Sequence, residues 1–228
     1  MKSGVIGVVS GEFEELNSEI NTFTKDGEEL HEAIEILDTV NSNLGKAFYG
    51  RAAVEDVTRD EGPVVNDEQI EVKSYIETET KMTEFLAVSG EFVIVENGSG
   101  TFAFNLIGRQ AEVLVERGRI DLDAYVDYLQ KQDRDEEAWQ AGFYGNGGEA
   151  EKGVVYGNNV LKDSDVGGVL DLSDLNQLGV SYSTRDHSMK ITVTESGYTN
   201  VYQPSNFESE DFLNFFASEL APYVSHPN

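Results

Sequence analysis

The sequence has 228 residues, and its 43 Asp and Glu against 16 Lys and Arg give a formal net charge of −27 at pH 7. It contains no cysteine, which excludes disulfides, thiolate catalysis and cysteine-ligated zinc or iron–sulfur centres. Hydrophobic residues make up 39% of the chain and aromatic residues 10%, so it can form an ordered core and lacks the composition of a disordered protein.

The acidic excess has two explanations. At about 1 M salt the Debye length falls to about 3 Å, so a dense acidic surface no longer repels itself strongly. The acids are spread from Glu12 to Glu219, and no cluster of Lys and Arg is available to bind phosphates. We therefore expect a halophilic protein of a high-salt cytoplasm that does not bind nucleic acid directly. The alternative is an acidic mimic of nucleic acid that inhibits a DNA- or RNA-binding protein.

The first 50 residues carry a heptad-like pattern. Steps of three and four residues from Phe13 meet an apolar residue at most positions up to Leu44. This spacing is typical of an amphipathic helix or a coiled-coil seam, so residues 1–50 are predicted to form a helical arm that mediates self-association. The predicted contact residues are Phe13, Leu16, Ile20, Phe23, Leu30, Ile34, Leu37, Asn41 and Leu44.

The same segment can be one helix or two. The unbroken phase of the apolar residues favours a continuous helix, in which Asn41 would fix the register of an oligomer. The turn residues Lys25, Asp26 and Gly27 favour a helical hairpin, because Asp26 and Glu29 resemble a capping pair at the start of a second helix. Both alternatives remain open, and both make residues 12–48 helical.

Beyond residue 50 apolar and polar residues alternate, which predicts β-strands. Residues 70–76 predict a half-buried strand, and Phe92–Val95 with Phe102–Ile107 predict a β-hairpin joined by a Gly-rich turn. Further strands are predicted at 180–183, 190–194 and 198–203, and helices at 109–117, 121–132 and 208–224.

These elements predict an α+β fold, in which the helical arm or hairpin is followed by an antiparallel sheet with helices packed on one face. The predicted organisation is the arm at 1–50, an α+β unit at 51–141, a Gly-rich linker at 142–152 and a second unit at 153–228. A similarity between 120–129 and 207–216 suggests a duplicated β-hairpin-plus-helix unit, although any two amphipathic helices share part of such a pattern. No run of about 18 apolar residues occurs, so no membrane span is expected.

One acidic window has the spacing of a calcium loop. The candidate ligands are Asp163, Asp165, Asp171 and Asp174, at positions 1, 3, 9 and 12 of a twelve-residue window. With Gly168 at position 6, the window resembles the EF-hand and dockerin loops, and Ca²⁺ is the cofactor that it suggests. Gly167 provides no side-chain oxygen at position 5, however, and Asp174 is shorter than the usual Glu. The alternative is a turn, a short strand and a capped helix.

The sequence contains no convincing catalytic constellation. His187 lies beside Asp186 and Ser188, but adjacent residues of a turn point in different directions and do not form a triad. The Gly-rich segment 142–148 lacks the Lys and Ser or Thr of a phosphate loop. We therefore expect a non-enzymatic structural or protein-interaction protein that forms homo-oligomers or binds a protein partner. A metal-binding or hydrolase module that uses clustered Asp and Glu is a further alternative.

Overall fold

The computed structural model describes residues 1–42, 44–66, 69–132, 136–147, 150–170, 172–184 and 187–226. The strands are β1 (Ser3–Ser10), β2 (Glu19–Lys25), β3 (Glu28–Ser42), β4 (Gly45–Val65), β5 (Ile70–Val88), β6 (Phe92–Val95), β7 (Leu114–Arg117), β8 (Arg119–Ile120), β9 (Glu137–Gly147), β10 (Ala150–Tyr156), β11 (Asp174–Ser183), β12 (Ser188–Thr194), β13 (Tyr198–Gln203) and β14 (Val224–Ser225). The helices are α1 (Phe102–Ala111), α2 (Leu122–Lys131), α3 (Ser164–Leu170) and α4 (Ser209–Phe215), and α4 continues into a π-helical turn (Phe216–Leu220).

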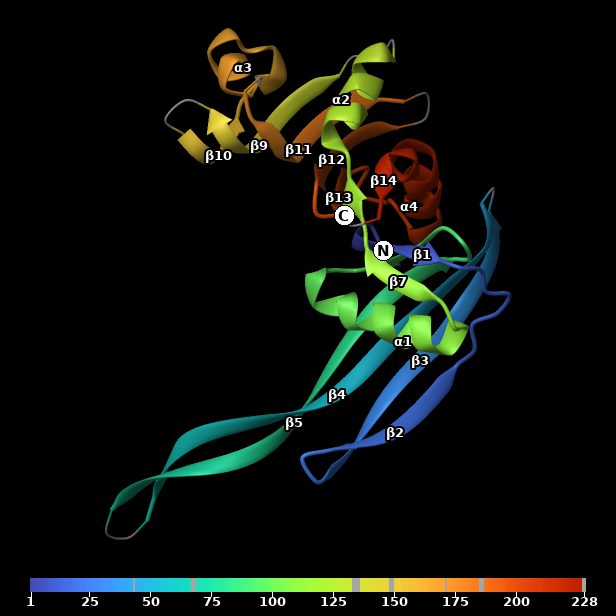
Figure 1. The fold of residues 1–228 in the computed structure, drawn as a ribbon, viewed down its shortest axis with the longest axis vertical. Helices are drawn as coiled ribbons and strands as arrows, with labels where there is room; N and C mark the ends of the chain where they lie inside the picture. Colours follow the sequence, from blue (N-terminus) through green and yellow to red (C-terminus); the bar gives the residue numbers. More distant parts are fainter. Residues whose placement is uncertain are drawn as a thin grey trace.

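Among the described residues, one large antiparallel sheet has the strand order β10-β9-β11-β12-β13-β1-β6-β5-β4-β3-β2, and β7 also pairs with β1. Strands β8 and β14 pair with each other in a separate two-stranded sheet. Figure 1 shows two lobes that meet at β1: a first lobe of β1–β7 with α1, and a second lobe of β8–β14 with α2–α4. The long hairpin β4–β5 projects from the first lobe away from the second.

The sheet buries side chains on both of its faces where the lobes meet. Side chains of a strand alternate between the two faces, and β6 illustrates this. Phe92 and Ile94 pack in a core with residues of α2 and α4, whereas Val93 and Val95 pack in a second core with residues of α1. The helices therefore cover opposite faces of one sheet, not one face as predicted.

The predicted N-terminal helical arm is wrong. Strands account for 57% of the described residues and helices of all types for 23%, and the segment 19–42 forms the hairpin β2–β3. Its turn explains the difference, because Asp26 and Gly27 have φ values of 54° and 89° and lie between the paired residues Lys25 and Glu28. Two residues with positive φ form a type I′ turn, which closes a β-hairpin and has no place in a continuous helix. The fold is a mainly antiparallel β protein with short helices.

Other predicted elements have mixed outcomes. The predicted helix 121–132 is confirmed as α2, and the three strands between 180 and 203 are confirmed as β11, β12 and β13. The predicted strand at Phe102–Ile107 is wrong, because Asn97 accepts hydrogen bonds from the backbone N–H groups of Ser99 and Gly100 and starts a turn that leads into α1. The described part of the predicted linker 142–152 lies in the paired strands β9 and β10.

Candidate functional site

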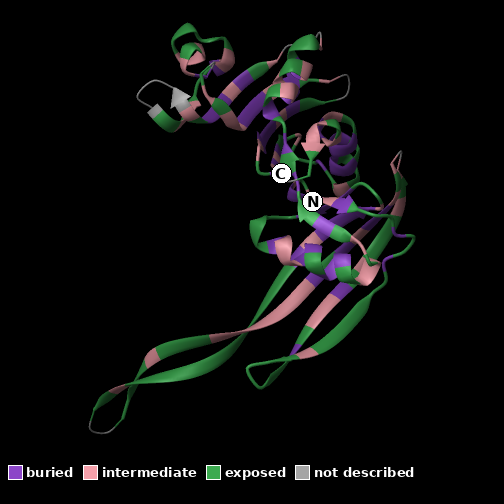
Figure 2. Ribbon diagram, viewed as in Figure 1, coloured by how far each residue is buried: buried purple, intermediate pink, exposed green. Residues whose placement is uncertain are grey.

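Beyond the first lobe, β4 and β5 continue as a ribbon with no other strand beside it. Pairing of β4 with β3 ends at Val54, whereas β4 stays paired with β5 as far as Val65 and Ile70. Residues 57–65 and 70–78 are referred to here as the arm. Figure 2 shows that the arm is mostly exposed. Since most of its residues are exposed, the arm contributes little to the core. An isolated two-stranded ribbon is only marginally stable in water, so the arm is a candidate binding element.

The register of β4 and β5 gives the arm two chemically different faces. Directly paired residues lie on the same face of an antiparallel ribbon, and successive residues alternate between faces. The apolar face carries Val57, Pro63, Val65, Ile70, Val72 and Ile76, together with the polar residues Ser74 and Thr78. The acidic face carries Asp60, Glu71 and Glu77, together with Lys73, Val64 and Tyr75.

Apart from the half-buried Val57, the apolar side chains of this face are exposed to solvent. Val65, Ile70 and Val72 are 76%, 71% and 69% exposed. The charged groups of this face are Arg59 and Glu61, whose charges cancel, and Arg59 has no ion pair within the described residues. Contiguous exposed apolar surface is uncommon in monomers and marks interaction sites. The apolar face is therefore the strongest candidate for a binding surface among the described residues.

An ion pair and a hydrogen bond join the root of the arm to the neighbouring β2–β3 hairpin. Lys25 Nζ lies 2.5 Å from Asp56 Oδ1, and His31 Nδ1 lies 2.9 Å from Glu55 Oε2. The hydrogen bond from Lys25 lowers the pKa of Asp56 below its usual value, and the hydrogen bond with the His31 side chain lowers the pKa of Glu55. These contacts hold the place where the arm leaves the first lobe.

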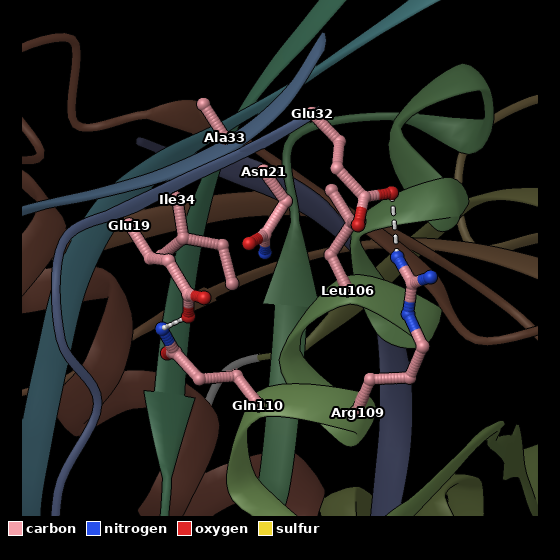
Figure 3. A pocket seen from close by; sticks show the side chains of 8 residues that line it. All are labelled: Glu19, Asn21, Glu32, Ala33, Ile34, Leu106, Arg109 and Gln110. Atoms are coloured by element: carbon pink, nitrogen blue, oxygen red, sulfur yellow. Dashed lines mark hydrogen bonds and ion pairs between the residues drawn. The ribbon is translucent and has the colours of Figure 1, made fainter. Parts of the chain in front are cut away.

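A small cavity of about 210 Å³ lies between α1 and the β2–β3 hairpin. Figure 3 shows Leu106, Arg109 and Gln110 of α1 opposite the side chains of the two strands. The strand residues that line it are Glu19, Asn21, Glu32, Ala33 and Ile34.

Four of the polar side chains that line this cavity bind one another in two pairs. Arg109 Nη2 donates to Glu32 Oε2 at 2.6 Å, and Gln110 Nε2 donates to Glu19 Oε2 at 3.0 Å. The volume is below the roughly 300–1,000 Å³ of typical ligand pockets. The lining contains no Ser, Thr, Cys or Lys that a neighbouring base could activate. These two contacts connect α1 to the β2–β3 hairpin across the cavity.

Three of the four predicted calcium ligands lie in or near α3. Asp163 and Asp165 stand at its start and Asp174 begins β11, while Asp171 lies outside the described residues. The Asp163 carboxylate accepts hydrogen bonds from the backbone N–H groups of Val166 and Asp165, which cap α3 and lower the pKa of Asp163. Within the described ranges, no three His, Cys, Asp or Glu side chains come together to hold a metal. The calcium site stays a prediction.

The predicted self-association residues do not form one surface. Four of them are buried, namely Phe13, Leu16, Leu30 and Ile34. Ile20 and Leu37 are exposed on β2 and β3, and the remaining three, Phe23, Asn41 and Leu44, lie on β2, on β3 and in the turn that follows β3. Since the helix that would align these nine residues does not exist, their spacing no longer identifies an interface.

The sequence does not single out the arm as a site, although it contains part of the signal. The alternation over 70–76 predicts β5 and its apolar side correctly, but predicts a half-buried strand where the structure has an exposed one. No known protein-family model and no curated protein sequence matches the chain, so the site rests on its geometry. In the part of the chain that the structure describes, no helix has the length and apolar character to cross a membrane.

Proposed function

We propose that the protein is a non-enzymatic interaction protein that associates with itself through the apolar face of the arm. The observation that carries this proposal is the exposure of Val65, Ile70 and Val72 on one side of an uncovered ribbon. Burial of such a side chain is worth about 1.5–3 kcal/mol. A contact that covers several of them supplies the driving force for association.

A second copy of the chain is the partner that we propose. The net charge of −27 opposes the approach of two whole molecules. The arm reduces this repulsion, because the charges of Arg59 and Glu61 on its apolar face cancel and its length separates the lobes of the two copies. Concentrated salt screens the remaining repulsion. We therefore propose a homo-oligomer that forms in the high-salt cytoplasm of a halophilic organism.

Shortening the arm tests this proposal. In the shortened variant, an Asn-Gly turn replaces residues 57–78 and joins Asp56 to Glu79, its partner across the ladder. Sedimentation equilibrium at about 1 M KCl is expected to give an oligomer for the full chain and a monomer for the shortened chain. Both chains are expected to unfold at the same temperature when diluted to monomers. A monomeric full chain, or an equally associated shortened chain, overturns the proposal.

The acidic face of the arm supports a second candidate, the acidic mimic of nucleic acid. Asp60, Glu71 and Glu77 lie on one side of a projecting ribbon, and Lys73 neutralises part of this charge through an ion pair of 3.2 Å with Glu71. Binding of a basic partner to this face weakens as salt rises. Self-association through the apolar face strengthens under the same change, so the sign of the salt dependence separates the two candidates.

A further inference from the structure

In the described ranges of the second lobe, α2, α3 and α4 all pack in one core on the same face of the sheet, which leaves the other face without a helix. On the helix-covered face, Ala141 of β9, Leu178 of β11 and Ile191 of β12 are fully buried in the core formed with α2 and α4. Residues one position away point to the other side of the sheet. Gly179 is one of them, and a Cβ placed on it would lie 2.7 Å from the Trp139 ring, so this ring lies across the uncovered face.

Aromatic side chains gather on this uncovered face. The rings of Trp139 and Tyr202 meet edge to face with centroids 6.0 Å apart, and Lys190 Nζ lies 4.8 Å from the centroid of the Trp139 ring. Next to them, Gln140 Nε2 donates to the Tyr156 hydroxyl at 3.4 Å. These five residues are referred to here as the aromatic platform. Gln140 is buried, but Tyr156 is 67% exposed and Tyr202 is 48% exposed, so the platform offers these two rings to solvent.

We infer that the aromatic platform receives the apolar face of the arm of a second copy. This inference rests on the proposed self-association and names the surface that it uses. The arm of the same molecule points away from the second lobe and does not reach its own platform (Figure 1). Packing of one sheet face on another is an ordinary way to bury strand side chains, and aromatic residues dominate the energetics of such contacts.

The charges of the two surfaces are complementary. The apolar face of the arm carries Arg59 and Glu61, two positions apart on β4. The platform side of the second lobe carries Glu137 and Lys190, each paired with Ser181 of the strand between them. The two charges of each set lie about 7–10 Å apart, given the rise of a strand and the spacing between strands. Each surface thus offers one acid and one base at a similar separation.

The area of the contact favours a reciprocal exchange of arms. The nine arm residues of each strand give the ribbon a length of about 30 Å and a width of about 10 Å, so one face offers about 300 Å². A single pair of facing arms would bury about 600 Å², below the roughly 1,200 Å² of stable interfaces. Two copies that each place an arm on the platform of the other make the contact twice and reach about 1,200 Å². In a symmetric dimer with exchanged arms, the apolar face of each arm and the aromatic platform of each copy are both covered.

Paired cysteine substitutions test this inference directly, because the natural chain has no cysteine. V72C places a thiol on the apolar face of the arm, and Y156C places one on the platform. A mixture of the two variants under mild oxidation at about 1 M KCl is expected to yield a disulfide between positions 72 and 156, identified by mass spectrometry of the linked peptides. V64C, on the acidic face of the same arm, is the matched control and is expected not to yield this product with Y156C.

The outcomes separate the inference from the proposed function. Disulfides of V72C with itself and none with Y156C, in chains that sediment as oligomers, overturn the platform as the receiving surface and leave self-association intact. Chains that sediment as monomers overturn both. Trp139 is the single tryptophan of the sequence, so its fluorescence gives a second readout without cysteines. Its emission is expected to move to shorter wavelength as the natural chain associates, and an unchanged emission during association contradicts the inference.

Discussion

The base and the arm of the β4–β5 hairpin belong to one ladder but differ in what covers them. At the base, Phe85 and Leu86 are 1% and 0% exposed and pack into the two cores on opposite faces of the sheet. In the arm, Val72 and Ile76 of the same strand are 69% and 49% exposed. Alternation of apolar and polar residues marks a side for burial in both regions. The cover comes from the helices at the base, and in our proposal it comes from a second molecule at the arm.

The largest difference in unfolding free energy is expected between two alanine substitutions on the same face of β5. Leu86→Ala is expected to lower the free energy of unfolding by about 2–5 kcal/mol, because it opens a cavity in the core. Ile76→Ala lies ten positions away in an uninterrupted register and is expected to change this free energy by no more than about 0.5 kcal/mol. Urea denaturation of dilute, monomeric protein measures both values. Equal losses of unfolding free energy in the two variants would mean that the arm and the base are packed as one unit. That result contradicts the difference in cover between them.

A smaller effect is expected from two glycines of β4. A Cβ on Gly50 would lie 2.5 Å from the carbonyl oxygen of Glu35 and 2.5 Å from the Phe85 ring, so Gly50→Ala is expected to cost about 1–3 kcal/mol. A Cβ on Gly62 in the arm would lie 3.1 Å from the ring of Tyr75, whose exposed side chain has room to move. Gly62→Ala is therefore expected to leave the thermal unfolding temperature of the monomer nearly unchanged. A similar loss in both variants would show that the arm is packed as tightly as the base.

The smallest effect on stability is expected at the root of the arm, which lies between the arm and the base of the β4–β5 hairpin. Because the folded state lowers the pKa of Asp56, its contribution to stability is complete above the ordinary value of 3.8 and is lost as the pH falls through the lowered pKa. Lys25→Met removes the hydrogen bond that is the main cause and is expected to raise the pKa of Asp56 toward the ordinary value. Titration of the carboxyl carbon by NMR measures this shift. An unchanged pKa in the variant would show that the Lys25 contact does not set it.

Local residue patterns predict much of the second lobe but not the N-terminal strands. The alternation in β11–β13 and the amphipathic pattern of α2 are correct because neighbouring residues determine them. The error at 19–42 arises because apolar residues three and four positions apart also occur in strands rich in β-branched side chains. Asp26-Gly27, read as a helical turn, is instead a strong hairpin signal. Local hairpin chemistry therefore outweighed the apparent helical period.

The two surfaces of the proposed contact are predictable to different degrees. The apolar side of the arm is visible in the spacing of Ile70, Val72 and Ile76, but its lack of cover depends on where the helices pack. The aromatic platform is not visible in the sequence. Trp139, Tyr156 and Tyr202 belong to three different strands, and only the order of β9, β10 and β13 in the sheet places them on one side. Both surfaces of the proposed contact depend on tertiary arrangement, which periodicity does not encode.

The most direct test of the proposed self-association compares Val72→Lys with Val64→Lys. Both variants replace a valine of the same arm and add one positive charge, but Val72 lies on the apolar face and Val64 on the acidic face. In a dimer with two arm contacts, Val72→Lys is expected to weaken association at least about 100-fold at about 1 M KCl, as measured by sedimentation equilibrium. Val64→Lys is expected to leave the association constant unchanged. Equal weakening by both variants, or no weakening by Val72→Lys, would contradict the claim that the apolar face of the arm is the self-association surface.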